Sequence, residues 1–383
     1  MIFFCLMGSG MFAGSAPSLR IRALGPDMAY LVCDTLADTR LNPASGHRAF
    51  ISGYGLVLDT PGVGFANADW VVDYSLDDIY GPIPYDPTYL TGTLRVSRRF
   101  GSLWPFIHLT GRLLAGNWFP GDYYDFYDYR NMFLLSARPG IGFAGEGWEG
   151  AFSLGYGYSR DTFSYSYDYF DEQGNRVMGE DYNLYRDMGL RVEAITRFFA
   201  GANKDWVLGL GATMRFSAGW WRDSTLRVIS GPTEDTTIVD IDEGDRESYG
   251  LNIRPGVMRE IRLGPDATCW VGLTSTFDWG YGRYGDYSWD GSGELYLSVP
   301  GGVEIAFGPE QKRFFVRAGI RAYEYVYFFR DYYNHPVGFE QPAIKLGYHG
   351  FGLRLYDRLV IDVAKDYMPV DFLDYRLELT YCF

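Results

Sequence analysis

The sequence predicts an all-β protein, a transmembrane, antiparallel, up-and-down β-barrel of about fourteen strands. The first observation is composition: 18% of the 383 residues are aromatic and 48 are glycine, against roughly 27 glycines in an average chain of this length. The second is a long-range alternation of apolar and polar side chains, which has the period of a strand. The third is a last strand whose alternation runs to a terminal aromatic residue.

The start of the chain predicts export. Residues 1–16 are mostly apolar and end in the small residues Ala13-Gly14-Ser15-Ala16, which suit signal-peptidase cleavage. We therefore expect a signal peptide over 1–16, an N-terminal plug-like segment over 17–48 and the barrel over 49–383. After Ala16 no run of 18 or more apolar residues occurs. This excludes a helical membrane span and leaves a barrel open.

The segment 206–220 shows the alternation most clearly. Its even positions are apolar from Trp206 to Trp220, whereas its odd positions include Thr213 and Arg215. Because successive side chains of a strand point to opposite faces, one face would contact lipid and carry a tryptophan at each end. That is the pattern of a membrane strand between two aromatic girdles.

The same alternation recurs along the chain. It predicts strands at 49–58, 89–99, 103–115, 130–143, 148–163, 183–199, 205–220, 248–263, 267–280, 293–308, 313–328, 342–355, 358–365 and 371–383. Short turns alternate with long loops, which is the layout of bacterial outer-membrane barrels. Counts of 12 or 16 stay open, chiefly because residues 69–76 could form another strand.

The last predicted strand carries a candidate assembly signal. Tyr375, Leu377, Leu379, Tyr381 and Phe383 share one face. This resembles the terminal signature that the barrel-assembly machinery reads. It predicts the outer membrane of a diderm bacterium as the location, with outer-membrane lipid and lipopolysaccharide as partners.

Acidic and basic residues are distributed unequally between the predicted loops and strands. The net charge of −14 argues against a nucleic-acid partner, because a phosphate backbone needs a basic face. The acids gather in the predicted loops, whereas arginines recur on the non-lipid faces of the strands. These charges either neutralise one another in a closed lumen or form a positive constriction that favours anionic solutes. The candidate lumen charges are Arg95, Arg112, Arg138, Arg191, Glu193, Arg215, Glu294, Glu304, Arg317 and Arg321.

Prolines interrupt several predicted strands. Pro105, Pro139, Pro255 and Pro300 cannot donate a hydrogen bond to the ladder, so we expect bulges or gaps beside them.

A motif precedes the first predicted strand. Asn42-Pro43-Ala44 resembles the Asn-Pro-Ala segment near the mature N-terminus of the long-chain fatty-acid transporter family. The resemblance implies a plug inside a fourteen-stranded barrel and passive uptake of small molecules, hydrophobic ones among them. The sequence departs from the family at Ser45-Gly46-His47, where a glycine and an apolar residue are usual. The alternative is that Asn42-Pro43 caps a short helix or a turn.

No motif for catalysis is found. None of the four histidines, His47, His108, His335 and His349, lies in a zinc-protease or serine-hydrolase motif. We therefore expect no enzyme, no cofactor and no metal site. The leading function is passive uptake with a small-molecule ligand. One alternative is a structural or interaction barrel with a closed ionic lumen and loops that bind a partner or glycan, and another is a general porin.

Overall fold

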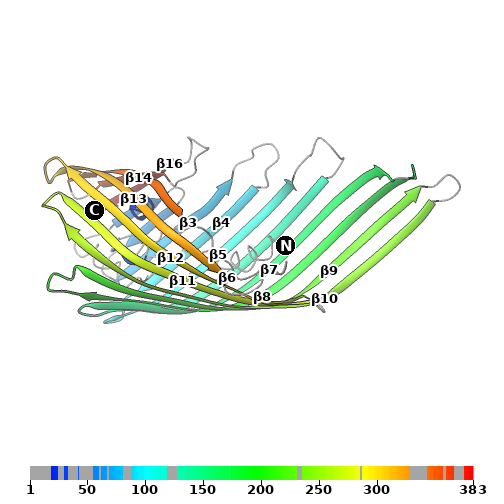
Figure 1. Cartoon of the computed structure of the whole chain (residues 1–383), viewed down its shortest axis with the longest axis horizontal. Helices are drawn as coiled ribbons and strands as arrows, with labels where there is room; N and C mark the ends of the chain where they lie inside the picture. The colour runs from blue at the N-terminus through cyan, green and yellow to red at the C-terminus, as the bar shows by residue number, and fades with distance from the viewer. Residues whose placement is uncertain are drawn as a thin grey trace.

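The computed structural model describes residues 19–24, 30–32, 42, 55–59, 62–66, 69–80, 88–118, 127–171, 173–230, 235–284, 287–327, 343–356, 359–365 and 375–382. Its strands form one closed barrel (Figure 1). Each strand pairs antiparallel with its neighbours in sequence, and the first strand pairs with the last. The predicted fold class is confirmed.

The helix α2 spans Leu19–Leu24. The strands are β1 Gly55–Asp59, β2 Gly62–Ala66, β3 Trp70–Tyr80, β4 Thr88–Arg98, β5 Leu103–Trp118, β6 Tyr127–Ala144, β7 Trp148–Phe170, β8 Arg176–Ala200, β9 Trp206–Ser230, β10 Asp235–Arg262, β11 Ala267–Tyr284, β12 Tyr287–Phe307, β13 Lys312–Tyr327, β14 Ala343–Leu355, β15 Leu359–Lys365 and β16 Tyr375–Cys382. In this described part of the chain, no helix is long and apolar enough to cross a membrane.

All fourteen predicted strands have a counterpart. Two further strands, β2 and β3, lie where a single loop was expected, so the described residues contain sixteen, the upper count left open. The alternation over 69–76 indicated β3. A strand of five residues such as β2 is too short to show a clear period.

The outward face of the barrel is apolar. On β9, Leu208, Leu210 and Met214 are exposed, whereas the intervening Val207 and Thr213 are buried toward the lumen. The alternation along 206–220 thus separates two faces as predicted. A band of large exposed apolar side chains around the wall is what a lipid-facing barrel requires.

Aromatic rows bound this band at both ends. At the short-turn end, Trp206 and Trp148 are exposed on the outer face. At the other end, Phe216, Tyr249 and Tyr281 of adjacent strands pack in a row with tilted rings, whose centroids are 5.1 and 6.0 Å apart. These rows match the two girdles of a membrane barrel and mark where the lipid-facing wall begins and ends.

The proline positions coincide with gaps in the ladders. Pairing of β6 with β7 skips Arg138 and Pro139, that of β10 with β11 skips Pro255, and that of β11 with β12 skips Pro300. The register is unchanged across each gap, so these are missing pairs and not bulges. Pro105 keeps its register partner in β6.

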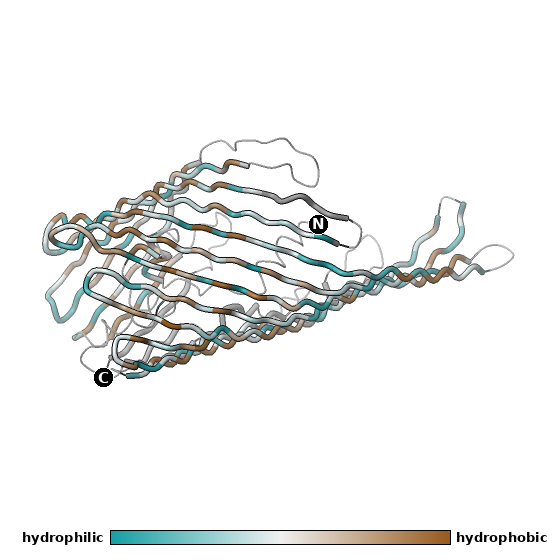
Figure 2. The backbone as a smooth tube through the Cα atoms, turned by 90° about the horizontal axis from the view of Figure 1, so that it is seen from below, coloured by the Kyte–Doolittle hydropathy of each residue, from teal (hydrophilic) through white to brown (hydrophobic). Residues whose placement is uncertain are grey.

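Four strands project beyond the membrane band. β7, β8, β9 and β10 have 23, 25, 25 and 28 residues, and in Figure 2 they leave the barrel as a long arm at the right. On β9 about ten residues follow Trp220, or roughly 33 Å of strand. This projecting sheet reaches into the medium on the side of the long loops.

A matched pair of substitutions tests the membrane boundary. Leu210 and Leu226 lie on the same face of β9 and are 45% and 46% exposed, but only Leu210 lies between the two girdles. Leu210→Arg should lower the free energy of unfolding from lipid vesicles by about 2 kcal/mol. Leu226→Arg should change it by less than about 0.5 kcal/mol. Urea titration followed by tryptophan fluorescence measures both, and equal losses would contradict the boundary.

Candidate functional site

The described N-terminal residues lie inside the barrel. Helix α2 contacts β12, β13, β14, β15 and β16. Ile21 and Leu24 of the helix and Leu31 after it are fully buried. The spacing of Ile21 and Leu24 places both on one helix face, so the segment presents apolar side chains to the wall. We call residues 19–24 and 30–32 the lumen segment.

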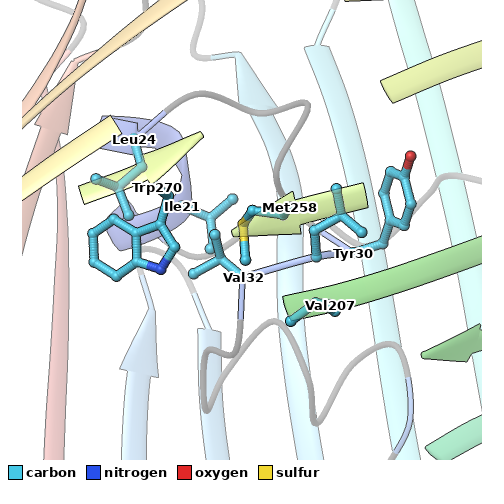
Figure 3. Packing of buried hydrophobic residues seen from close by; sticks show 8 residues of the cluster. Ile21, Leu24, Tyr30, Val32, Val207, Met258 and Trp270 are labelled. Atoms are coloured by element: carbon cyan, nitrogen blue, oxygen red, sulfur yellow. The ribbon is translucent and has the colours of Figure 1, made fainter. Parts of the chain in front are cut away.

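The wall under the lumen segment is apolar. Val207, Met258 and Trp270, from β9, β10 and β11, form one buried cluster with Ile21, Leu24 and residues 30–32 (Figure 3). Partly buried Ile195 and Phe199 of β8 pack against this cluster. Lumen faces of membrane barrels are ordinarily polar, so this apolar patch on the inner wall depends on the lumen segment for its burial.

Glycines in the wall allow the close approach. A Cβ atom on Gly209 would lie 2.7 Å from Leu31 Cδ2, and one on Gly256 would lie 2.5 Å from Tyr30 Oη. A Cβ on Gly319 would overlap the Leu24 carbonyl oxygen. A side chain at Gly209 or Gly256 would force Leu31 or Tyr30 to move, whereas one at Gly319 would meet backbone and push the segment away from the wall.

Hydrogen bonds hold the N-terminal residues to the wall. Tyr30 Oη donates to the carbonyl oxygen of Pro255 at 3.0 Å, beside the gap in the β10–β11 ladder. Asn42 is buried and its Nδ2 donates to the carbonyl oxygen of Phe143 at 3.1 Å. Both bonds run from a side chain of the N-terminal region to a backbone carbonyl of the wall, and so tie the two together.

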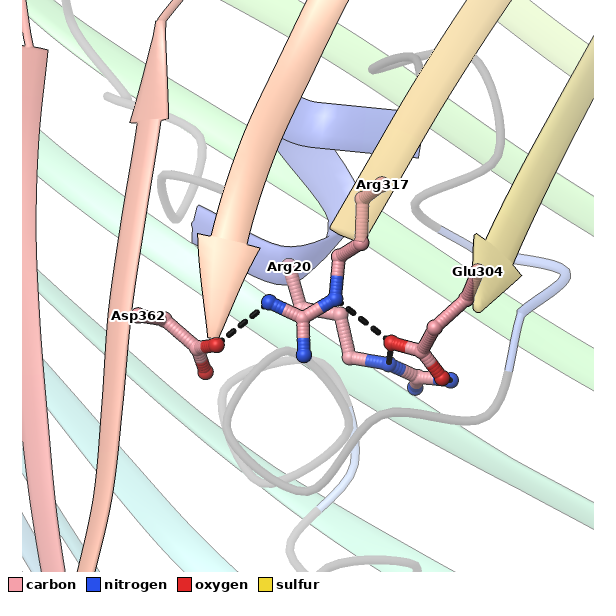
Figure 4. Close-up of polar contacts among 4 residues, drawn as sticks. All are labelled: Arg20, Glu304, Arg317 and Asp362. Atoms are coloured by element: carbon pink, nitrogen blue, oxygen red, sulfur yellow. Dashed lines mark hydrogen bonds and ion pairs between the residues drawn. The ribbon is translucent and has the colours of Figure 1, made fainter. Parts of the chain in front are cut away.

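An ionic network joins the lumen segment to three strands. Arg20 donates from Nε and Nη2 to the two carboxylate oxygens of Glu304 at 3.0 and 3.2 Å. Arg317 Nε donates to Glu304 Oε2 at 2.5 Å, and Arg317 Nη1 donates to Asp362 (Figure 4). The guanidinium of Arg20 also lies 5.4 Å from the ring centroid of Trp270. Arg20 therefore contacts both the charged wall and the apolar patch.

A second network surrounds Glu193. Arg138 forms an ion pair with this carboxylate, and Arg191 and Arg254 lie 3.3 and 3.9 Å from it. His108 is buried, with Nδ1 2.5 Å from Arg138 Nη2. The structure thus brings Arg138, Arg191 and Glu193 together from β6 and β8, next to the gap beside Pro139.

The other predicted lumen charges divide between the second network and other positions of the wall. Arg95, which pairs with Asp73 at 2.6 Å, lies opposite His108, and His108 lies opposite Arg138. Arg215 lies opposite Arg191. Elsewhere, Glu294 lies opposite Asp278 and Arg112 opposite Thr91, and Arg321 lies 4.7 Å from the ring centroid of Tyr323. Five of the ten predicted charges, Arg95, Arg138, Arg191, Glu193 and Arg215, therefore lie in or beside the second network.

Several predicted residues lie outside the described part of the chain. These are the signal peptide 1–16, Pro43, Ala44 and Phe383. Of the assembly signal, the backbone from Tyr375 to Tyr381 lies in β16, which pairs with β1 and β15. The side chains of Tyr375, Leu377, Leu379 and Tyr381 are outside the description.

Sequence reasoning missed the residues that carry the site. Arg20, Tyr30, Val207, Met258 and Trp270 were not singled out. One signal was present, because Val207 and Trp270 are apolar residues at positions whose alternate neighbours are small or polar. Apolar side chains on a predicted lumen face indicate a buried contact inside the barrel.

The fold and the occupied lumen define a membrane β-barrel with an N-terminal segment seated inside. No protein-family model and no curated protein matches the chain. Among solved structures it is similar to the toluene transporter TodX of Pseudomonas putida, with 12% identity over 97% of this chain and 96% of that chain and a TM-score of 0.48. It is also similar to the monoaromatic hydrocarbon channel CymD, with 11% identity over 97% and 99% and a TM-score of 0.44. The ferric yersiniabactin uptake receptor FyuA of Yersinia pestis has 8% identity over 84% and 70% and a TM-score of 0.34. Values this low establish no shared function, and the fold rests on the strand pairing itself.

Replacing Arg317 or Arg20, the two arginines of the first network, by alanine should have different effects on the stability of the barrel. Arg317→Ala removes the cation that Glu304 and Asp362 share, and breaking a buried ion pair costs about 3–5 kcal/mol. Arg20→Ala leaves Arg317 beside Glu304, so the barrel should lose less than about 1 kcal/mol while protease cleavage of the N-terminal region increases. Urea titration and limited proteolysis measure the two effects. If both variants destabilised the barrel equally, Arg20 would be needed for the stability of the barrel itself and would not act only as an anchor of the lumen segment.

The close packing over Gly319 can be tested separately. Gly319→Ala should displace α2, because its new Cβ meets the Leu24 carbonyl, and amide exchange in residues 19–24 and 30–32 should become at least about tenfold faster. The control is Gly111→Ala, at a strand glycine whose Cβ would have no heavy atom within 4 Å. Unchanged exchange in both variants would rule out the tight contact.

Proposed function

We propose that this protein is a passive uptake channel for small hydrophobic molecules in the outer membrane of a diderm bacterium, with its N-terminal residues as the plug. The observation that carries the proposal is the apolar patch on the inner wall, which is buried by a separate part of the same chain. The patch lies at Val207, Met258 and Trp270, where a polar lumen would be expected.

The anchors of the lumen segment are noncovalent and therefore reversible. They include the Arg20–Glu304 ion pair, the Tyr30 hydrogen bond, a hydrogen bond from Arg197 to the Val32 carbonyl oxygen and apolar packing over glycines. A solute that replaces the segment on the patch would bury roughly 150 Å² of apolar surface, worth about 4 kcal/mol or a dissociation constant near 1 mM. Weak binding of this kind suits passive transport, because a solute must leave as readily as it enters.

The interaction barrel is the second candidate. The observation that favours it is a set of buried ion pairs across the wall, including Arg95 with Asp73, Arg197 with Glu149 and Arg246 with Asp187. Such pairs neutralise the lumen and would keep it closed. A non-enzymatic role is common to both candidates. Lipopolysaccharide and the barrel-assembly machinery are proposed partners on the pattern of the terminal strand.

Entry of N-phenyl-1-naphthylamine into vesicles with a lipopolysaccharide outer leaflet tests uptake. The wild-type protein should raise the entry rate above that of protein-free vesicles. Arg20→Ala combined with Tyr30→Phe should raise it at least about fivefold further, because loss of an ion pair and a hydrogen bond increases the open population. Arg176→Ala is the control, since its ion pair with Asp168 lies at the exposed tip of the β7–β8 hairpin.

Planar-bilayer conductance separates the alternatives. Steady ionic conductance of the wild-type protein would indicate a general porin. Entry no faster than in protein-free vesicles, for both the wild type and the double variant, would overturn the uptake proposal and leave the interaction barrel.

A further inference from the structure

One edge of the projecting sheet has a single neighbour. β10 pairs with β9 from Asp235 onward, but its pairing with β11 begins only at Arg246, opposite Tyr284. β11 and β12 meet in a tight hairpin at Tyr284 and Tyr287, so β11 extends no further along β10. Within the described chain, residues 235–245 therefore form an edge strand, which we call the β10 edge.

The β10 edge is fully accessible from the medium. Residues 235–243 are all exposed, and they lie beyond the outer aromatic row at Tyr249. A strand edge presents backbone donors and acceptors that can pair with another extended chain. The geometry is thus suited to the addition of a strand from a second molecule.

The side chains of the edge are acidic and apolar. Asp240, Asp242, Glu243 and Asp245 make residues 240–245 an acidic half that contains no lysine or arginine. Ile241 within this half and the preceding Ile238 and Val239 are β-branched, apolar and 41–63% exposed. Beta-branched residues favour strand pairing, whereas exposed apolar side chains on a soluble edge favour a partner that covers them.

The ladder adds an electrostatic reason for a cationic partner. Asp242 lies directly opposite Asp223 of β9, and like charges opposite one another destabilise a sheet. A lysine or arginine on an added strand would lie within reach of Asp242 and of its acidic neighbours. A second copy of the β10 edge in the full antiparallel register would instead place Asp240 opposite Asp240 and Asp245 opposite Asp235, so self-association in this register is disfavoured.

We propose that the β10 edge binds an extended polypeptide segment by strand addition. The segment carries basic residues opposite Asp240, Asp242, Glu243 and Asp245 and apolar residues opposite Ile238, Val239 and Ile241. Since every ladder in the barrel is antiparallel, the basic half of the segment comes first in its sequence. The proposal concerns an external surface and does not depend on transport through the lumen.

The probe is a labelled peptide, Lys-Thr-Lys-Lys-Val-Lys-Val-Val-Thr-Thr-Lys, added to the full-length protein in detergent micelles at low ionic strength. Fluorescence anisotropy should show saturable binding. Two further peptides carry N-methyl groups on either the odd or the even amides. Strand addition uses only one set of amides, so one methylated peptide should lose binding and the other should retain it.

Charge is tested with matched triple variants. Asp240→Asn with Asp242→Asn and Glu243→Gln should weaken binding at least about fivefold, as expected for three exposed charge pairs. Glu146→Gln with Glu180→Gln and Glu310→Gln removes three exposed carboxylates elsewhere and should leave binding unchanged. Absence of saturable binding, equal binding of both methylated peptides, or equal losses in the two variants would each overturn the proposal.

Discussion

The constraint on which the rest of the structure depends is the closure of the sheet between β1 and β16. In a lipid environment every backbone donor and acceptor of the wall needs a partner within the protein, and an open edge would leave a row of them unsatisfied. Closure forces the alternation of each strand into an outer and an inner face. It thereby creates a lumen that the chain must fill, either with charges, with water or with its own N-terminal residues.

The chain fills this lumen in two ways that support each other. Ion pairs such as Arg317 with Asp362 neutralise the wall, while the lumen segment covers the apolar patch around Trp270. Arg20 belongs to both arrangements, since it pairs with Glu304 and lies over Trp270. Wall glycines such as Gly209 and Gly319 make this contact possible by leaving room for the segment. Together these residues hold the segment against the wall.

Outside the membrane band, the sheet does not need to be closed. β7 to β10 continue as an open sheet beyond the girdle, where water can satisfy the backbone groups of an edge. The acidic side chains of the β10 edge are compatible with that setting, because charges on an exposed edge discourage pairing with identical copies. The barrel therefore has an apolar patch on its inner wall and an acidic strand edge outside the membrane band.

Much of the fold could be predicted from periodicity, because a strand shows its two faces in residues that are adjacent in sequence. The alternation over 206–220 predicted where β9 begins and the face that Leu210 occupies, but β9 continues ten residues further, to Ser230. The prolines predicted missing pairs at Pro139, Pro255 and Pro300. The sequence predicted which charged residues line the lumen but not which of them pair. Glu193, for example, lies beside arginines from β6, β8 and β10, which are far apart in the sequence.

By itself the sequence determined that the chain forms a barrel, which side chains of a strand such as β9 face outward, and that pairs are missing beside Pro139, Pro255 and Pro300. These are local properties that follow from side-chain alternation and from the missing amide of proline. Only the tertiary structure decided that Arg20 meets Glu304, 284 positions away, and that Tyr30 finds the Pro255 carbonyl. Contacts between the lumen segment and the wall depend on the closed, tilted arrangement of all the strands, and no local pattern records that arrangement.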